Sequence, residues 1–311
     1  MRLASIASVL FLTLAACGDD GGSTTPDAPM VDDIGFTKPK AALKSNMEVS
    51  KNNWTEIGPA DLTCLGTPNA DMATTVAVTL TTKVKDFQSG NAVPGTVVTA
   101  FRDQNTADMI AGPVTSDGNA DLSMMFPVGV KRFGFKMTNS NALDTLLLNQ
   151  TLDPAMPTQM ISQIQSVSTA TAQTLPALIG VSRTPGTGIL AGAVRDCAGN
   201  EMSNFIATVS STEASLTSTV DVVKHLPGVD AYYFSASVGL PVRHSQQQHS
   251  SKNGLFMAIE MQPTAMAYVQ VWGYKNDADL AADKLSLIAQ LKSAVIADVV
   301  ITGSYDPLRT P

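Results

Sequence analysis

The chain has 311 residues, of which 44% are hydrophobic and only 15% are charged, and its formal net charge is −7. This length leaves room for about two domains. A charged share below the usual quarter of residues indicates a surface rich in Ser, Thr, Asn and Gln, which suits an exported β-rich protein. The acidic balance and the lack of a Lys/Arg cluster exclude nucleic acid as a predicted partner.

The N-terminus has the pattern of a secretory leader. One positive charge, Arg2, precedes an uncharged stretch over residues 3–16, which is shorter than the roughly 20 apolar residues of a membrane-spanning helix. Residues 14–17, Leu-Ala-Ala-Cys, resemble the lipobox of bacterial lipoproteins. The resemblance implies cleavage before Cys17 and acylation of that residue, and two or more acyl chains give a stable membrane anchor. We predict a signal peptide over residues 1–16; the alternative is an ordinary secretory signal with a cysteine near the cut by chance.

A polar stretch follows the cysteine. Residues 18–30, "GDDGGSTTPDAPM", have no hydrophobic periodicity and cannot bury apolar area. We therefore predict a flexible tether over residues 17–52, which places a lipid-anchored body in the bacterial cell envelope with the membrane as its first partner. Gly18, where some inner-membrane lipoproteins carry Asp, favours the outer membrane.

Alternating residues dominate the next part of the chain. Val76, Val78 and Leu80 alternate with Thr and Ala, and turn residues such as Asp117-Gly118 separate further alternating runs. Short strands punctuated by Gly and Pro are typical of a β-sandwich. We predict a first β-sandwich domain over residues 53–140.

The same pattern returns from Ile189. The later Val194-x-Asp196 matches Val84-x-Asp86, and Asn253-Gly254 takes the place of Asp117-Gly118. The shared order of these features predicts a tandem repeat, with a second β-sandwich domain over residues 188–311.

These turns and strands resemble the carboxypeptidase regulatory-like domain. The features that carry the resemblance are the Asp- and Gly-containing turn after the first strand, Pro94-Gly95, Asp117-Gly118 and Pro127-x-Gly129. The resemblance implies that each copy is a transthyretin-like, or prealbumin-like, Greek-key sandwich with a non-catalytic accessory role. It covers about residues 73–140 and, more weakly, about residues 188–275, where the Pro-Gly turn is missing and an insertion is present.

Two segments are predicted to be helical. Residues 141–187 lack strand alternation, and we predict a partly helical linker there, with a helix face formed by Met160, Ile164, Val167 and Thr171. Near the end of the chain we predict a C-terminal helix with a buried stripe formed by Leu280, Leu287 or Ile288, Leu291 and Val295.

Two cysteines remain besides Cys17. An exported protein passes through an oxidising space, so Cys64 and Cys197 are a possible disulfide. Two separate buried thiols are the alternative, because Cys also behaves as a small hydrophobe and sequence spacing cannot place two Cα atoms.

Candidate ligand residues are few. His225, His244 and His249 lie in or beside the polar insertion of the second copy without the spacing of a metal site, so we predict a solvated loop. The acids Asp277, Asp279 and Asp283 resemble a weak cation-ligand cluster but lack the glycine-enabled turn of a calcium loop, and a helix N-terminus explains the first two more simply. We predict no metal and no cofactor.

No pattern of a catalytic site is present. Gly-x-Ser-x-Gly, His-Glu-x-x-His and a P-loop are all missing from the sequence. We therefore predict a non-catalytic cell-envelope lipoprotein that acts as a binding or assembly module at the membrane surface, with envelope proteins or glycans as partners. One alternative is glycan binding through the insertion at about residues 225–253, beside which aromatic residues gather; the other, less favoured, is an enzyme of unrecognised type.

Overall fold

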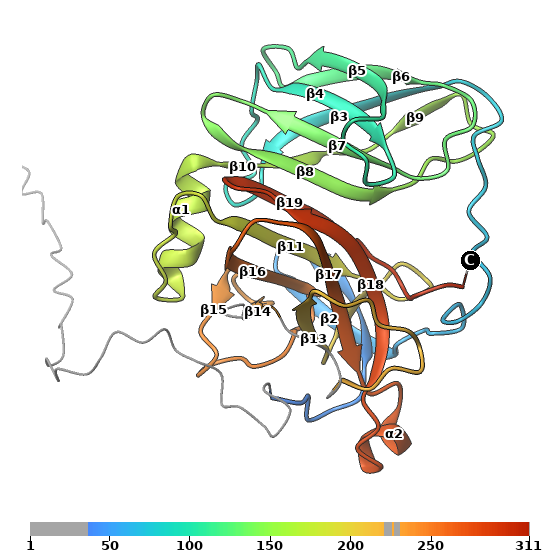
Figure 1. Ribbon diagram of the computed structural model, residues 1–311, viewed down its shortest axis with the longest axis vertical. Helices are drawn as coiled ribbons and strands as arrows, with labels where there is room; N and C mark the ends of the chain where they lie inside the picture. The colour runs from blue at the N-terminus through green and yellow to red at the C-terminus, as the bar shows by residue number, and fades with distance from the viewer. Residues whose placement is uncertain (1–36, 221–225, 227–230, 311) are drawn as a thin grey trace, which may run out of the picture.

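The computed structural model describes residues 37–220, 226 and 231–310, which form nineteen strands and two helices (Figure 1). The protein is therefore mainly β, as the alternating sequence predicts. The expected signal peptide, Cys17 and His225 lie outside the described residues. Among the described helices, none is long and apolar enough to cross a membrane.

Six strands build most of the first half of the fold, the upper part of Figure 1. They are β3 (Val78–Asp86), β4 (Val97–Arg102), β5 (Met109–Thr115), β6 (Asp121–Phe126), β7 (Phe133–Thr138) and β8 (Ala142–Gln150). In β3 and β6 every second residue is buried, as expected for strands with one face toward a core. Within that core, the ring centroid of Phe133 lies 4.7 Å from that of Phe126 and 5.1 Å from that of Phe135, and the centroids of Phe126 and Phe135 are 6.3 Å apart.

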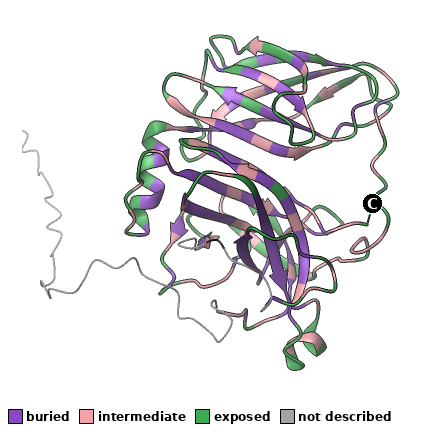
Figure 2. Ribbon diagram, in the orientation of Figure 1, coloured by how far each residue is buried: buried purple, intermediate pink, exposed green. Residues whose placement is uncertain are grey.

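The second half is built mainly from strands after residue 187. They are β11 (Gly188–Val194), β12 (Glu201–Ser203), β13 (Ile206–Ser210), β14 (Ala231–Phe234), β15 (Pro241–Val242), β16 (Leu255–Met261), β17 (Thr264–Gly273), β18 (Ser286–Val295) and β19 (Val299–Tyr305). Its core includes Phe205, Phe256, Val271 and Ile288. Most residues of these strands are buried, as Figure 2 shows.

The strand pairing of one half recurs in the other. The antiparallel pair β3–β6 corresponds to β11–β16, and the antiparallel series β4–β7–β8 corresponds to β13–β17–β18. The first strand of each half also takes a parallel neighbour, β10 (Ile164–Ser168) on β3 and β19 on β11. The chain thus repeats one pairing scheme in the order in which its motifs repeat.

The two halves share backbone hydrogen bonds. Strand β8 of the first half pairs in parallel with β19 of the second, from Val299 opposite Asp144 to Gly303 opposite Leu148. One sheet therefore runs through both halves in the order β15-β14-β16-β11-β19-β8-β10-β3-β6. Leu146 and Leu148 of β8 belong to the core of the second half, whereas Leu147 packs on the core of the first.

The expected helical linker is mostly strand. Residues 142–150 form β8, and β9 (Thr158–Met160) and β10 precede a helix that covers only Thr169–Leu178, α1. The predicted helix face is wrong, because β10 lies between the edges of β3 and β8 and pairs with both. The edges of β3 and β8 provide hydrogen-bond partners for the backbone of β10. A helix here would bury few side chains along one face.

The expected C-terminal helix is also wrong. Only Asp277–Ala281 form a helix, α2, with the side chain of Asn276 accepting a hydrogen bond from the Asp279 N–H. The remainder of the stripe lies in β18, which pairs with β17 along its length and is buried at most positions. The sequence pattern of an apolar run that is buried on both faces fits a strand and a helix equally well. Here, pairing with β17 makes the run a strand.

The expected tether and first domain also differ from the structure. Residues 44–50 form β1 and residues 53–59 form β2, a hairpin (Lys44–Ser50 and Asn53–Pro59) that pairs through β1 with β12 of the second half. The chain then runs from this hairpin to the first half, which it enters at Thr74, where the backbone N–H bonds to the Val130 carbonyl at 2.9 Å. The N-terminal hairpin therefore belongs with the last part of the sequence.

Candidate functional site

The two remaining cysteines form a disulfide. Cys64 and Cys197 have Cα atoms 5.7 Å apart and are 133 residues apart in the sequence. Cys197 follows β11, so the bridge fixes the segment after the N-terminal hairpin to the second half. The Cys197 N–H also donates to the Asp61 carbonyl at 2.8 Å, beside the bridge.

His244 and His249, the two described histidines of the insertion, each contact a backbone carbonyl. His244 is buried, stacks on Tyr232 with ring centroids 4.2 Å apart, and has its Nε2 2.8 Å from the Ala231 carbonyl. Nδ1 of His249 lies 3.3 Å from the Ser250 carbonyl. No cluster of three His, Cys, Asp or Glu side chains suited to a metal is found among the described residues.

The candidate acids serve local structure. Asp117 accepts hydrogen bonds from the N–H groups of Asn119 and Asp121 at 2.8 Å each, which closes a turn. Asp283 accepts from the hydroxyl of Tyr274 and the amine of Lys38, both at 2.6 Å, and these bonds lower its pKa.

The aromatic side chains that suggested a glycan platform point inward. All seven are buried: Tyr232, Tyr233, Phe234, Phe256, Tyr268, Trp272 and Tyr274. The indole Nε1 of Trp272 donates to Thr208 Oγ1 at 3.1 Å, inside the protein. Stacking on a sugar needs an exposed ring face, and none of these seven rings offers one.

Two buried aspartates mark the same place in each half. Asp86 accepts from the Ser89 N–H at 2.9 Å within its own turn and from the Ser168 N–H at 2.9 Å at the start of α1. Burial raises the pKa of Asp86, but the hydrogen bonds from Ser89 and Ser168 outweigh it and hold the pKa below the ordinary value. The carboxylate thus holds α1 on the first half.

Asp196 repeats this arrangement in the second half. One carboxylate oxygen accepts from the N–H groups of Ala198 and Asn200 at 3.0 and 2.8 Å, within its own turn. The other accepts from the hydroxyl of Ser45 and from the Asp61 N–H at 3.3 Å. This carboxylate therefore holds the N-terminal hairpin and the segment that follows it.

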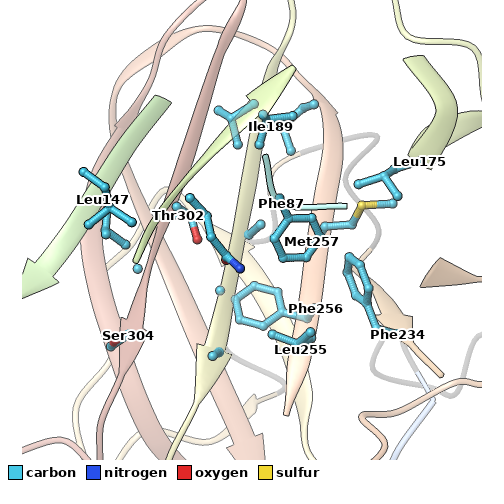
Figure 3. Close-up of a pocket in the computed structure, with 18 of the residues that line it drawn as sticks. Phe87, Leu147, Leu175, Ile189, Phe234, Leu255, Phe256, Met257, Thr302 and Ser304 are labelled. Carbon is cyan, nitrogen blue, oxygen red and sulfur yellow. The ribbon is translucent and has the colours of Figure 1, made fainter. Parts of the chain in front are cut away.

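The described part of the chain contains a large cavity that the sequence did not reveal, here called the junction cavity. It has a volume of about 420 Å³ and lies where β8, β10 and α1 of the first half meet β11, β16 and β19 of the second (Figure 3). Residues from both halves line it, including Phe87 and Leu147 from one half and Phe234, Met257 and Thr302 from the other. Ligand pockets typically have volumes of 300–1,000 Å³.

Small residues form the floor of the junction cavity. In register, Ala191 lies opposite Thr302, and Ala193 lies opposite Ser304. All four are half-buried. The residues between them in both strands point to the opposite face of the sheet and are buried. The strands on either side carry larger residues, with Met257 opposite Ala191 on one side and Leu147 opposite Thr302 on the other. The outer face of β11 and β19 is therefore a trough.

The polar residues of the cavity lie on or beside β8, β10, β11 and β19, whereas β16 contributes apolar residues. The lining includes the uncharged Gln150, Gln163 and Gln165, and Arg195 is its one charged residue. Arg195 follows β11, six residues beyond Ile189 at the other end of the trough, and its Nε lies 3.4 Å from Oε1 of Glu201. At about 3.3 Å per residue, the trough is about 20 Å long.

Comparisons with known proteins give distant similarities only. No protein-family model matches the chain, and no curated protein matches it. Among solved structures, the shaft pilin SpaA of Lactobacillus rhamnosus GG is 11% identical, with 76% of this chain and 98% of that chain covered and a TM-score of 0.21.

Two further matches are equally remote. The Bacillus anthracis TIE protein is 10% identical, with 75% of this chain and 34% of that chain covered and a TM-score of 0.23. BcpA, the major pilin subunit of Bacillus cereus, is 9% identical, with 72% of this chain and 68% of that chain covered and a TM-score of 0.20. Scores this low do not define a shared fold.

Proposed function

We propose that this protein is a non-catalytic binding module of the bacterial cell envelope, anchored by lipid at Cys17 and presenting the junction cavity to a ligand. The observation that carries the binding role is the cavity, whose lining is mostly apolar with a few polar groups. Its one charged side chain, Arg195, has no acid or base partner within the lining, so the cavity suits binding better than proton transfer.

The anchor is proposed from the sequence. The lipobox-like residues 14–17 are followed by a polar stretch over residues 18–30, and the first strand begins at Lys44. A stretch of this length lets a lipid at Cys17 sit in a bilayer while the β-structure stays in water. Gly18 favours the outer membrane as the final location.

We also propose that the two halves are tandem transthyretin-like Greek-key sandwiches. The repeated strand pairing and the equivalent buried aspartates, Asp86 and Asp196, support this origin. In that interpretation the protein is a duplicated accessory module whose halves have fused along β8 and β19.

The anchor is tested by intact-mass analysis and fatty-acid labelling in the native bacterium. The native chain is expected to begin at Cys17 and to carry acyl mass. Cys17→Ala is expected to abolish fatty-acid labelling and to release the protein from the membrane. Ser23→Ala is the matched control, because it changes a small polar residue outside the lipobox and should leave labelling unchanged. A native product without acyl mass would refute the anchor.

A further inference from the structure

We propose that the junction cavity binds a single straight-chain amphiphile with an anionic head, of the size of a medium-chain fatty acid, with its chain over the floor of β11 and β19 and its carboxylate at Arg195. This proposal rests on the binding role proposed above and names the class of ligand.

The size of the cavity limits the ligand. Its volume of about 420 Å³ lies within the 300–1,000 Å³ of typical pockets for small ligands. Dodecanoate is a small ligand with a single chain.

The shape of the cavity favours a chain over a compact ring system. Its floor is only two strands wide, because Met257 and Leu147 rise from the strands on either side of Ala191 and Thr302. Adjacent strands lie about 4.8 Å apart. A narrow trough with a length of about 20 Å accommodates one extended alkyl chain.

The two ends of the cavity differ in polarity. At the end near Ile189, the apolar side chain of Leu175 from α1 lies beside the trough (Figure 3). At the other end lies Arg195, whose guanidinium can hold a carboxylate through two parallel hydrogen bonds. Since Arg195 contacts Glu201 through Nε only, at 3.4 Å, this interaction leaves its two Nη groups for a ligand. An apolar tail therefore points to α1 and an anionic head points to Arg195.

The experiment uses the whole chain in its native membranes and a dodecanoate analogue that carries a photoactivatable diazirine. After irradiation, we expect adducts in peptides from β11, β16, β19 or α1, and we expect excess dodecanoate to reduce labelling at least tenfold. Labelling that is absent, or that dodecanoate does not reduce, would overturn the proposal.

The matched variants are Ser304→Phe and Ser123→Phe. Both place a ring on the outer face of a sheet at a position that is not buried, but only Ser304 lines the cavity. Ser304→Phe is expected to reduce labelling at least tenfold and Ser123→Phe less than twofold. Ala191→Leu fills the same floor with a smaller side chain and replaces Ser304→Phe if that variant does not fold.

The head group is tested with Arg195→Gln. We expect labelling by the dodecanoate probe to fall at least fivefold, and labelling by the matching dodecanol probe to change less than twofold. Equal losses for both probes would overturn the role of Arg195. Acyl mass at Cys17, measured in the same preparation, separates failure of the ligand proposal from failure of the anchor.

Discussion

The two halves share one pairing scheme but differ in what covers their outer faces. In the first half, β10 extends the sheet that contains β3, and Asp86 fixes α1, which follows β10. In the second half, Asp196 instead fixes the N-terminal hairpin, and the outer face of β11 and β19 keeps a floor of small residues. The junction cavity thus combines the floor of small residues in the second half with β10 and α1 of the first.

The largest expected effect tests whether the halves are independent. Phe135→Ala in the core of the first half and Phe205→Ala in the core of the second are each expected to lower the free energy of unfolding by about 3–5 kcal/mol. Because β8 and β19 share a hydrogen-bonded ladder, we expect one cooperative transition in each variant, measured by chemical denaturation with two spectroscopic probes. Two separated transitions would show that the halves unfold independently.

Removal of the disulfide should act on the second half. The double variant Cys64→Ala/Cys197→Ala is expected to lower the free energy of unfolding by about 2–5 kcal/mol, since the bridge closes a long loop. Hydrogen exchange should rise most in residues 60–67, while β3 and β6 keep their protection. Faster exchange throughout the first half would contradict this assignment.

The paired aspartates permit a direct comparison between halves. Asp86→Asn and Asp196→Asn each place an amide donor against N–H donors, so each is expected to lower the free energy of unfolding by about 1–3 kcal/mol. Hydrogen exchange should increase in α1 for Asp86→Asn and in the N-terminal hairpin for Asp196→Asn. The reverse pattern, or the same pattern in both variants, would refute the equivalence.

The smallest effect is a pH dependence of stability. Because the folded-state pKa of Asp86 lies below its ordinary value of 3.8, its stabilisation is present above that pH and is lost as the pH falls through the folded pKa. The stability difference between the native chain and Asp86→Asn should therefore be constant above about pH 5 and shrink below about pH 4. Denaturation at a series of pH values measures it, and a difference that grows on acidification would contradict the sign.

Sequence pattern identified the strands that have one buried face. In β3, Val78, Leu80 and Val84 alternate and are buried together, so period-two reasoning succeeded there. It failed for β18, where Leu287, Ile288 and Leu291 are all buried and their spacing also fits a helix. The cavity was missed because its floor consists of small residues such as Ala191 and Thr302, which carry no strong hydrophobic or chemical signal.

By itself, the sequence determined the β class and the repeated order of strands and turns, because both depend on residues that are close together in the chain. The anchor is a prediction from the same kind of local pattern. Only the tertiary structure decided that Cys64 meets Cys197, that the N-terminal hairpin joins the second half, and that β8 pairs with β19. These are contacts between segments far apart in sequence. The backbone N–H and C=O groups at a sheet edge are the same for every residue type except proline, so the sequence does not show which strand will pair there. The junction cavity exists only because such contacts place small residues side by side.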